Sequence, residues 1–104
     1  MSVTVESSGN LIIAYLIGEL DHHTSAETRE KIDNVISYKK PQHLILDFKN
    51  VTFMDSSGIG LVMGRYRNIS KTGGELHITG TSPQIYKVMK LAGIERLAKL
   101  EGNI

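Results

Sequence analysis

A chain of 104 residues with 40% hydrophobic and 22% charged side chains has room for one domain with one core, which argues against a two-domain enzyme. Its 12 basic and 11 acidic residues are interspersed and give a formal charge of +1, so the basic stripe needed for nucleic-acid binding is lacking. Cysteine is absent, and no signal peptide or membrane-spanning run is evident. We expect a soluble cytoplasmic protein with no direct nucleic-acid or membrane contact.

The N-terminal segment predicts a β-hairpin. Val3 and Val5 alternate with polar residues, and residues 8–10 (Ser-Gly-Asn) are typical of a turn. The run 11–17 is apolar on both faces, as in a central strand. The two segments therefore predict paired strands at the start of a sheet.

A first helix is predicted after the hairpin. Residues 24–27 (Thr-Ser-Ala-Glu) have the spacing of a capping box, in which both end side chains bond free backbone N–H groups. Pro41 ends this segment, and residues 43–48 predict a buried strand. The apolar face of the helix is expected to comprise Ala26, Ile32, Val35 and Ile36.

The second half of the chain repeats this alternation. From Ser57 apolar residues recur with the helical period of about 3.6, until the Gly-Gly pair at 73–74. Residues 75–79 predict a strand, Ser82-Pro83 starts another helix, and residues 97–100 predict a last short strand. The order predicts an α/β domain with a mixed, mostly parallel sheet and right-handed crossovers. The apolar stripes are Ile59, Val62, Met63, Tyr66 and Ile69 in one helix, and Ile85, Val88, Met89 and Ala92 in the other.

The most informative segment is 53–60 (Phe-Met-Asp-Ser-Ser-Gly-Ile-Gly), where a strand passes into a helix. Ser56 is expected at the helix N-terminus, where free backbone N–H groups and the helix dipole favour an anion. Asp and Ser are also the preferred N-cap residues, so a purely structural cap is the alternative interpretation.

Catalytic and ligand-binding motifs fit this chain poorly. A nucleophile elbow needs glycine two residues before and after the serine, which neither Ser56 nor Ser57 has. Gly58, Gly60 and Gly64 miss the dinucleotide fingerprint by one residue and are instead expected to let the helix lie close on the sheet. We predict no cofactor. We also predict no metal site, because His22 and His23 are adjacent whereas His43 and His77 are far apart in the sequence.

These residues resemble those of a known family. Residues 18–24 (Gly-Glu-Leu-Asp-His-His-Thr), 53–60, 64–66 and 73–75 closely resemble the STAS-domain anti-anti-sigma factors, in particular the anti-sigma F factor antagonists of sporulating bacteria (the stage II sporulation protein AA family). The resemblance covers nearly the whole chain as one STAS domain, 1–104, and implies a mixed sheet with helices packed on one side. Family members commonly continue into a further helix, which we expect to be absent from a sequence that stops at Ile104.

The resemblance also implies a regulatory cycle. The unphosphorylated family protein binds an anti-sigma factor that is also a serine kinase, and the sigma factor is released. The kinase phosphorylates the serine that follows the motif's aspartate, and a serine phosphatase reverses this. The aspartate is Asp55 here, so the phosphorylated residue is Ser56, with Asp21 beside it. Asp21, Asp55, Ser56, Ser57 and Gly58 are then the expected partner-binding residues.

Two other functions are compatible with parts of this pattern. One is a STAS-like small-molecule sensor or scaffold module without phosphorylation, but nonphosphorylatable relatives often replace the serine that is intact here as Ser56. The other is a small hydrolase-like enzyme, for which no motif links a histidine to Ser56. We therefore expect no catalytic residue and no enzymatic activity.

Overall fold

A computed structural model describes residues 2–102 and contains one five-stranded sheet in the order β1-β2-β3-β4-β5. β1 is antiparallel to β2, whereas each later strand is parallel to its neighbour, as predicted. The strands are β1 (Ser2–Ser8), β2 (Leu11–Leu20), β3 (His43–Met54), β4 (Glu75–Thr81) and β5 (Lys99–Gly102). The helices are α1 (Ser25–Lys39), α2 (Ser56–Ser70), α3 (Pro83–Leu91) and the short 3₁₀ helix η1 (Ile94–Arg96).

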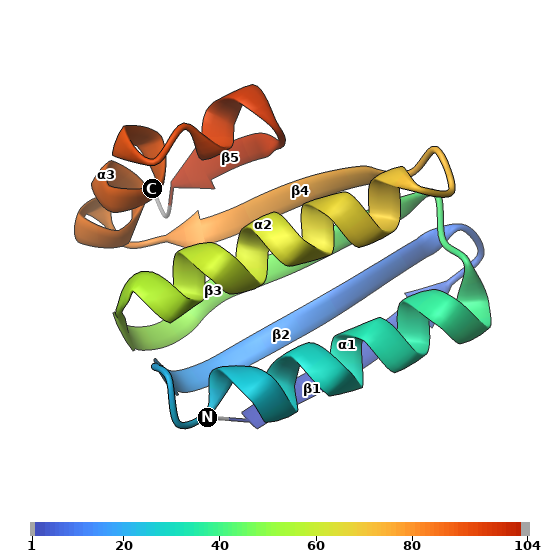
Figure 1. Cartoon of the computed structure of the whole chain (residues 1–104), viewed down its shortest axis with the longest axis horizontal. Helices are drawn as coiled ribbons and strands as arrows, with labels where there is room; N and C mark the ends of the chain where they lie inside the picture. The colour runs from blue at the N-terminus through green and yellow to red at the C-terminus, as the bar shows by residue number, and fades with distance from the viewer. Residues whose placement is uncertain (1, 103–104) are drawn as a thin grey trace.

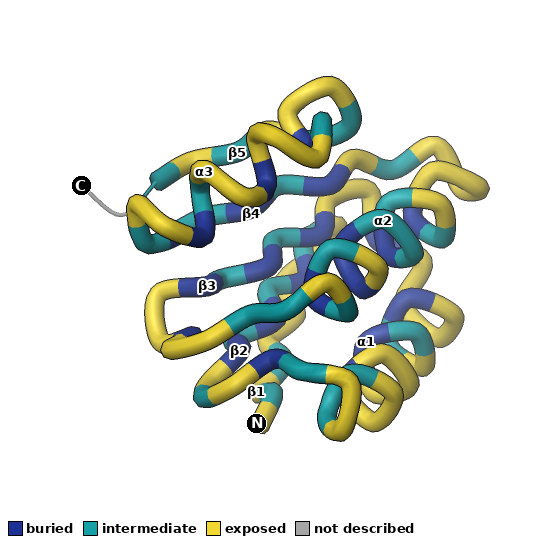
Figure 2. Tube along the Cα trace, turned by 60° about the vertical axis from the view of Figure 1, so that its left-hand side comes forward, coloured by how far each residue is buried: buried dark blue, intermediate teal, exposed yellow. Residues whose placement is uncertain are grey.

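Helices α1 and α2 lie side by side across one face of the sheet, and α3 lies near β4 and β5 (Figure 1). Successive side chains of a strand point to opposite faces of the sheet. Figure 2 shows the result as an alternation of buried and less buried residues along the central strands. The register pairs Leu44 with Leu76 and Leu46 with Ile78, so that neighbouring strands contribute to one core. Residues on the opposite face, among them Tyr15 and Ile45, are only partly buried. None of the helices in residues 2–102 is long and apolar enough to cross a membrane.

The N-terminus of α1 differs from the prediction. Thr24 is the N-cap residue, but its side chain makes no capping hydrogen bond, so the predicted capping box is not formed. Instead, Thr24 Oγ1 donates to the carbonyl oxygen of Glu19 at 3.0 Å. The predicted burial of Ala26 is also wrong, because this residue is exposed. The buried side of α1 comprises Thr28, Ile32 and Ile36, which recur every four residues.

Only one of the three α2 glycines lies against the sheet. A Cβ at the buried Gly58 would lie 2.6 Å from Met54 Sδ and 3.2 Å from Leu20 Cδ2. Gly60 is exposed with nothing within 4 Å, and the nearest atom to a Cβ at Gly64 is Arg67 Nη2, at 3.9 Å. The predicted close approach to the sheet is thus confirmed for Gly58 and wrong for Gly60 and Gly64.

The C-terminal elements follow the prediction with small shifts. Ser82 caps α3, its hydroxyl oxygen accepting from the N–H of Ile85 at 3.2 Å, and Pro83 opens the helix. Val88 and Ala92 are exposed rather than part of the apolar face. The last strand begins two residues later than predicted, because η1 comes first.

Candidate functional site

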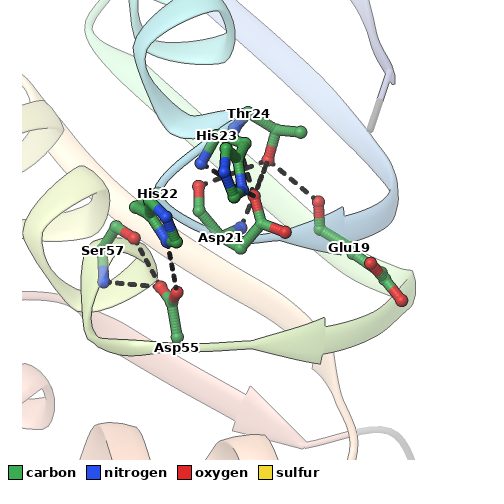
Figure 3. Close-up of polar contacts among 7 residues, drawn as sticks. All are labelled: Glu19, Asp21, His22, His23, Thr24, Asp55 and Ser57. Atoms are coloured by element: carbon green, nitrogen blue, oxygen red, sulfur yellow. Dashed lines mark hydrogen bonds and ion pairs between the residues drawn. The ribbon is translucent and has the colours of Figure 1, made fainter.

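Two loops meet at one edge of the sheet, where parallel strands β2 and β3 end. Residues 21–24 follow β2, and Asp55 follows β3. The N–H of Asp55 donates to the carbonyl oxygen of Leu20 at 3.2 Å, which holds the second loop against the first. The carboxyl ends of parallel strands are a common position for functional groups in α/β proteins. Figure 3 shows the polar side chains of both loops.

Asp55 is the N-cap residue of α2. Its backbone is extended, and its Oδ1 accepts from the Ser57 N–H at 2.8 Å and from the Ser57 hydroxyl (Figure 3). The hydrogen bond from the Ser57 hydroxyl is the largest influence on the Asp55 pKa and lowers it, partial burial opposes it, and the backbone N–H groups of Ser57 and His22 lower it further. Asp55 is therefore ionised at neutral pH, and the hydroxyl of Ser57 is engaged in a hydrogen bond to it.

Ser56 is the first residue of α2 and is exposed. Within residues 2–102, its hydroxyl makes no hydrogen bond. It lies next to the partly buried Asp55, at a helix end whose partial positive charge favours an anion. An accessible hydroxyl in this position can receive a phosphoryl group without prior rearrangement of the helix.

Asp21 organises the other loop. Its Oδ1 accepts from the N–H groups of His23 at 2.9 Å and Thr24 at 3.2 Å. Partial burial raises the pKa of Asp21, but these two bonds and a third from the Thr24 hydroxyl outweigh it, so the net shift is downward. The structure thus places a second ionised carboxylate on the loop beside Asp55.

The adjacent histidines lie over this edge of the sheet. His22 Nδ1 is 3.7 Å from Asp55 Oδ2, and His23 Nδ1 is 3.9 Å from Asp21 Oδ1. Their rings are 4.0 Å apart between centroids, and both side chains are largely exposed. Each histidine therefore faces an aspartate, and His22 links the loop after β2 to Asp55, the N-cap residue of α2 (Figure 3).

All five residues predicted for partner binding lie at this edge, but Gly58 is buried and packs against Met54 and Leu20. An apolar surface that was not predicted from the sequence lies beside the site. Phe53 and Val88 are 50% and 43% exposed, and both line a small groove. These two residues place exposed apolar area next to the polar groups of the site. The signal in the sequence was Phe53 itself, which directly precedes the motif's Met-Asp-Ser.

His43 and His77 are far apart in the sequence, yet they meet in the structure. Their Nδ1 and Nε2 atoms are 3.4 Å from each other on neighbouring strands, near the carboxylate of Glu75. Sequence separation gave no hint of this, because the register between β3 and β4 brings the two histidines together.

Comparison with known proteins identifies the family of this chain. The profile of the STAS domain matches residues 2–104, and the chain belongs to this family. It is 34% identical over 103 residues to an anti-sigma F factor antagonist of Paenibacillus polymyxa, covering 99% of this chain and 88% of the relative.

Two solved structures agree with this. The anti-sigma factor antagonist SpoIIAA in its unphosphorylated form has a TM-score of 0.83 at 32% identity, covering 95% of this chain and 87% of that one. The Bacillus cell fate determinant SpoIIAA in the phosphorylated form has a TM-score of 0.76 at 32% identity, covering 95% and 90%. The predicted family and fold are thereby confirmed.

Proposed function

We propose that this chain is an anti-anti-sigma factor that is switched by phosphorylation of Ser56. In its unphosphorylated form it binds an anti-sigma factor, and the sigma factor is released. The observation that carries the proposal is the exposed hydroxyl of Ser56 at the start of α2, which makes no hydrogen bond to any residue in the described range 2–102. The names of the relatives, anti-sigma factor antagonists, support the same function.

The geometry distinguishes between the two neighbouring serines. The Ser57 hydroxyl donates to Asp55 and is partly buried, so its phosphorylation would remove an N-cap interaction. Ser56 has no such role and is accessible to a kinase. This supports Ser56 as the phosphorylated residue and Ser57 as part of the helix cap.

The proposed contact surface combines charge with apolar area. Asp21, Asp55 and Ser56 form its polar part, Ser57 supports it, and Phe53 extends it across the groove. Gly58 contributes indirectly, because it allows α2 to begin close to the sheet. An exposed apolar anchor next to fixed carboxylates suits a specific, reversible protein interface.

Phosphorylation would oppose binding through charge. A phosphate adds about −1.5 to −2 charges to Ser56, next to two carboxylates. Weakening a nanomolar complex to micromolar affinity requires about 4 kcal/mol, which a desolvated like-charge contact can supply. The fold need not change, and the related SpoIIAA has been solved in a phosphorylated form with a similar fold.

The chain acts in this cycle as a substrate and not as a catalyst. We propose that the anti-sigma factor is itself the serine kinase and that a serine phosphatase removes the phosphate. Near Ser56, His22 faces Asp55 and His23 faces Asp21, so neither ring is engaged with the serine hydroxyl in the way a catalytic base would be.

The test is intact-mass analysis after incubation with ATP and the cognate anti-sigma factor. We expect one added phosphate in the wild type and in Ser57→Ala, and none in Ser56→Ala, while Ser56→Ala still binds the partner. Modification of Ser56→Ala but not of Ser57→Ala would show that the wrong serine has been assigned. Partner binding without any phosphorylation would favour the scaffold alternative.

A further inference from the structure

Two histidines and a glutamate form a cluster on the face of the sheet that α1 and α2 do not cover. His43 opens β3 and is paired in register with Glu75, the first residue of β4. His77 lies two residues beyond Glu75, so all three side chains leave the same face of the sheet. This cluster is a product of strand register and not of local sequence.

The separations between the three donor atoms are too long for a full set of hydrogen bonds. His43 Nδ1 and His77 Nε2 are 3.4 Å apart, whereas Glu75 Oε2 lies 3.9 Å from the first and 3.8 Å from the second. The carboxylate therefore hydrogen-bonds to neither ring. One carboxylate oxygen and two ring nitrogens converge on a common point between them.

These separations are close to those around a tetrahedral metal ion. Zinc–nitrogen and zinc–oxygen distances of about 2.0–2.2 Å place neighbouring ligand atoms about 3.3–3.6 Å apart. The nitrogen–nitrogen separation of 3.4 Å already meets this value. Glu75, whose side chain is 66% exposed, needs to move its oxygen by about 0.5 Å, which a single rotamer adjustment allows.

We propose that His43, Glu75 and His77 bind a divalent transition-metal ion of the zinc class. Two histidines and one glutamate are an established zinc ligand set, and they leave a fourth position for water or for a ligand from another molecule. Lys99, the β5 residue paired with His77, carries a positive charge that would lower the affinity for a cation if its side chain lay close to the site.

The metal site is separate from the phosphorylation site. His43 is the first residue of β3, whereas Ser56 lies two residues beyond its last residue, so the two sites lie at opposite ends of this strand. A bound metal would link β3 to β4 and stabilise the folded state. The proposal does not depend on the proposed regulatory function.

The experiment is titration of tag-free protein with ZnCl2 in a calorimeter, together with the visible spectrum after addition of Co²⁺. We expect saturable binding of one ion per chain and the ligand-field bands of a four-coordinate Co²⁺. His43→Ala and His77→Ala should each weaken Zn²⁺ binding at least tenfold and remove the Co²⁺ bands. Zn²⁺ should also raise the melting temperature of the wild type but not of these variants.

The control is the double variant His22→Ala/His23→Ala, which removes the other histidine pair and should bind Zn²⁺ as the wild type does. Glu75→Gln, at an exposed position, tests the third ligand if a histidine variant is unstable. Zinc affinity that survives both His43→Ala and Glu75→Gln would overturn the proposal. Loss of binding in the His22/His23 variant, or no saturable binding by the wild type, would overturn it too.

Discussion

Asp55 links the fold to the proposed function at the scale of a single residue. It caps α2, binds the hydroxyl of Ser57 and directly precedes Ser56. Because the Asp55 carboxylate accepts hydrogen bonds from Ser57, the Ser57 side chain is held in place, whereas Ser56 remains accessible. Two adjacent serines thereby acquire different roles.

The lowered pKa of Asp55 predicts an acid-dependent loss of stability. The pKa of Asp55 in the folded state lies below its ordinary value of 3.8. Ionised Asp55 therefore stabilises the folded state fully above pH 3.8, and this stabilisation is lost as the pH falls through the folded-state pKa. We expect Asp55→Asn, measured by urea unfolding between about pH 6 and pH 2, to show a weaker pH dependence than the wild type. Combining Asp55→Asn with Asp21→Asn should weaken the pH dependence of stability further. An unchanged acid dependence in the double variant would contradict this.

At the scale of the element, α2 depends on how closely its first turn approaches the sheet. Gly58 faces Met54 and Leu20, whereas Gly60 faces solvent. The packing of the helix on the sheet therefore requires glycine at position 58, whereas a Cβ added at position 60 would meet open space.

This difference predicts opposite effects of the same substitution. Gly58→Ala should destabilise the protein by about 1–3 kcal/mol, because the new methyl group displaces the Met54 side chain. Gly60→Ala should stabilise it by about 0.5–1 kcal/mol, because alanine is the better helix former. Chemical denaturation of both variants checks this. Equal effects would mean that α2 shifts away from the sheet to accommodate either change.

A buried ion pair joins α1 to α2. Arg65 is 4% exposed, and its Nε lies 2.8 Å from Asp33 Oδ1, which also accepts from Asn68 Nδ2 at 2.8 Å. Burial lowers the pKa of Arg65, and Asp33 partly offsets that effect. Within residues 2–102, neither Nε nor Nη1 of Arg65 makes a hydrogen bond of good geometry, so the ionic contact with Asp33 is the main compensation for burying the guanidinium.

Removal of Asp33 should therefore reduce the stability of the folded state more than removal of an ordinary surface charge does. We expect Asp33→Ala to lower the free energy of unfolding by about 1–3 kcal/mol, less than for a fully buried pair because Asp33 is 34% exposed. Glu30→Ala on the exposed side of α1 is the control and should change it by under about 0.5 kcal/mol. Arg65→Met should restore most of the stability to Asp33→Ala. Failure to restore it would mean that the guanidinium packs favourably without its partner.

At the scale of the whole molecule, the well-packed sheet and the exposed site together favour a switch that acts on the surface. Ser56 lies at the end of a helix that packs on the sheet core, and a phosphate there is compatible with the helix dipole. The two solved forms of SpoIIAA both resemble this chain.

We therefore expect phosphorylation of Ser56 to leave the fold nearly unchanged. Amide chemical shifts of unmodified, phosphorylated and Ser56→Asp protein should differ only around Asp21 and Ser56, while partner affinity falls in both modified forms. The fall should be smaller for Ser56→Asp, which carries less charge than a phosphate. Shift changes spread across all five strands would instead indicate that the domain refolds.

Local sequence patterns were sufficient for the element order and for the position of Ser56. Apolar periodicity and turn residues act over a few positions, so the strands and helices could be predicted with errors at their ends. The Asp-Ser-Ser-Gly block lies within one strand–helix junction. The positions of Asp55, Ser56 and Ser57 relative to the helix N-terminus could therefore be predicted from the sequence. The capping box predicted at residues 24–27 is not formed because the Thr24 hydroxyl bonds to the carbonyl oxygen of Glu19 near the end of β2 instead.

The tertiary structure alone decided the features that join distant parts of the chain. Which α2 glycine touches the sheet depends on how the helix is rotated, and the pairing of Arg65 with Asp33 depends on how α1 lies beside α2. The meeting of His43 with His77 depends on the register of two strands separated by a whole helix. The sequence shows which residues face the same side of their own element. Packing between elements determines which of them meet, because that arrangement depends on the whole core at once.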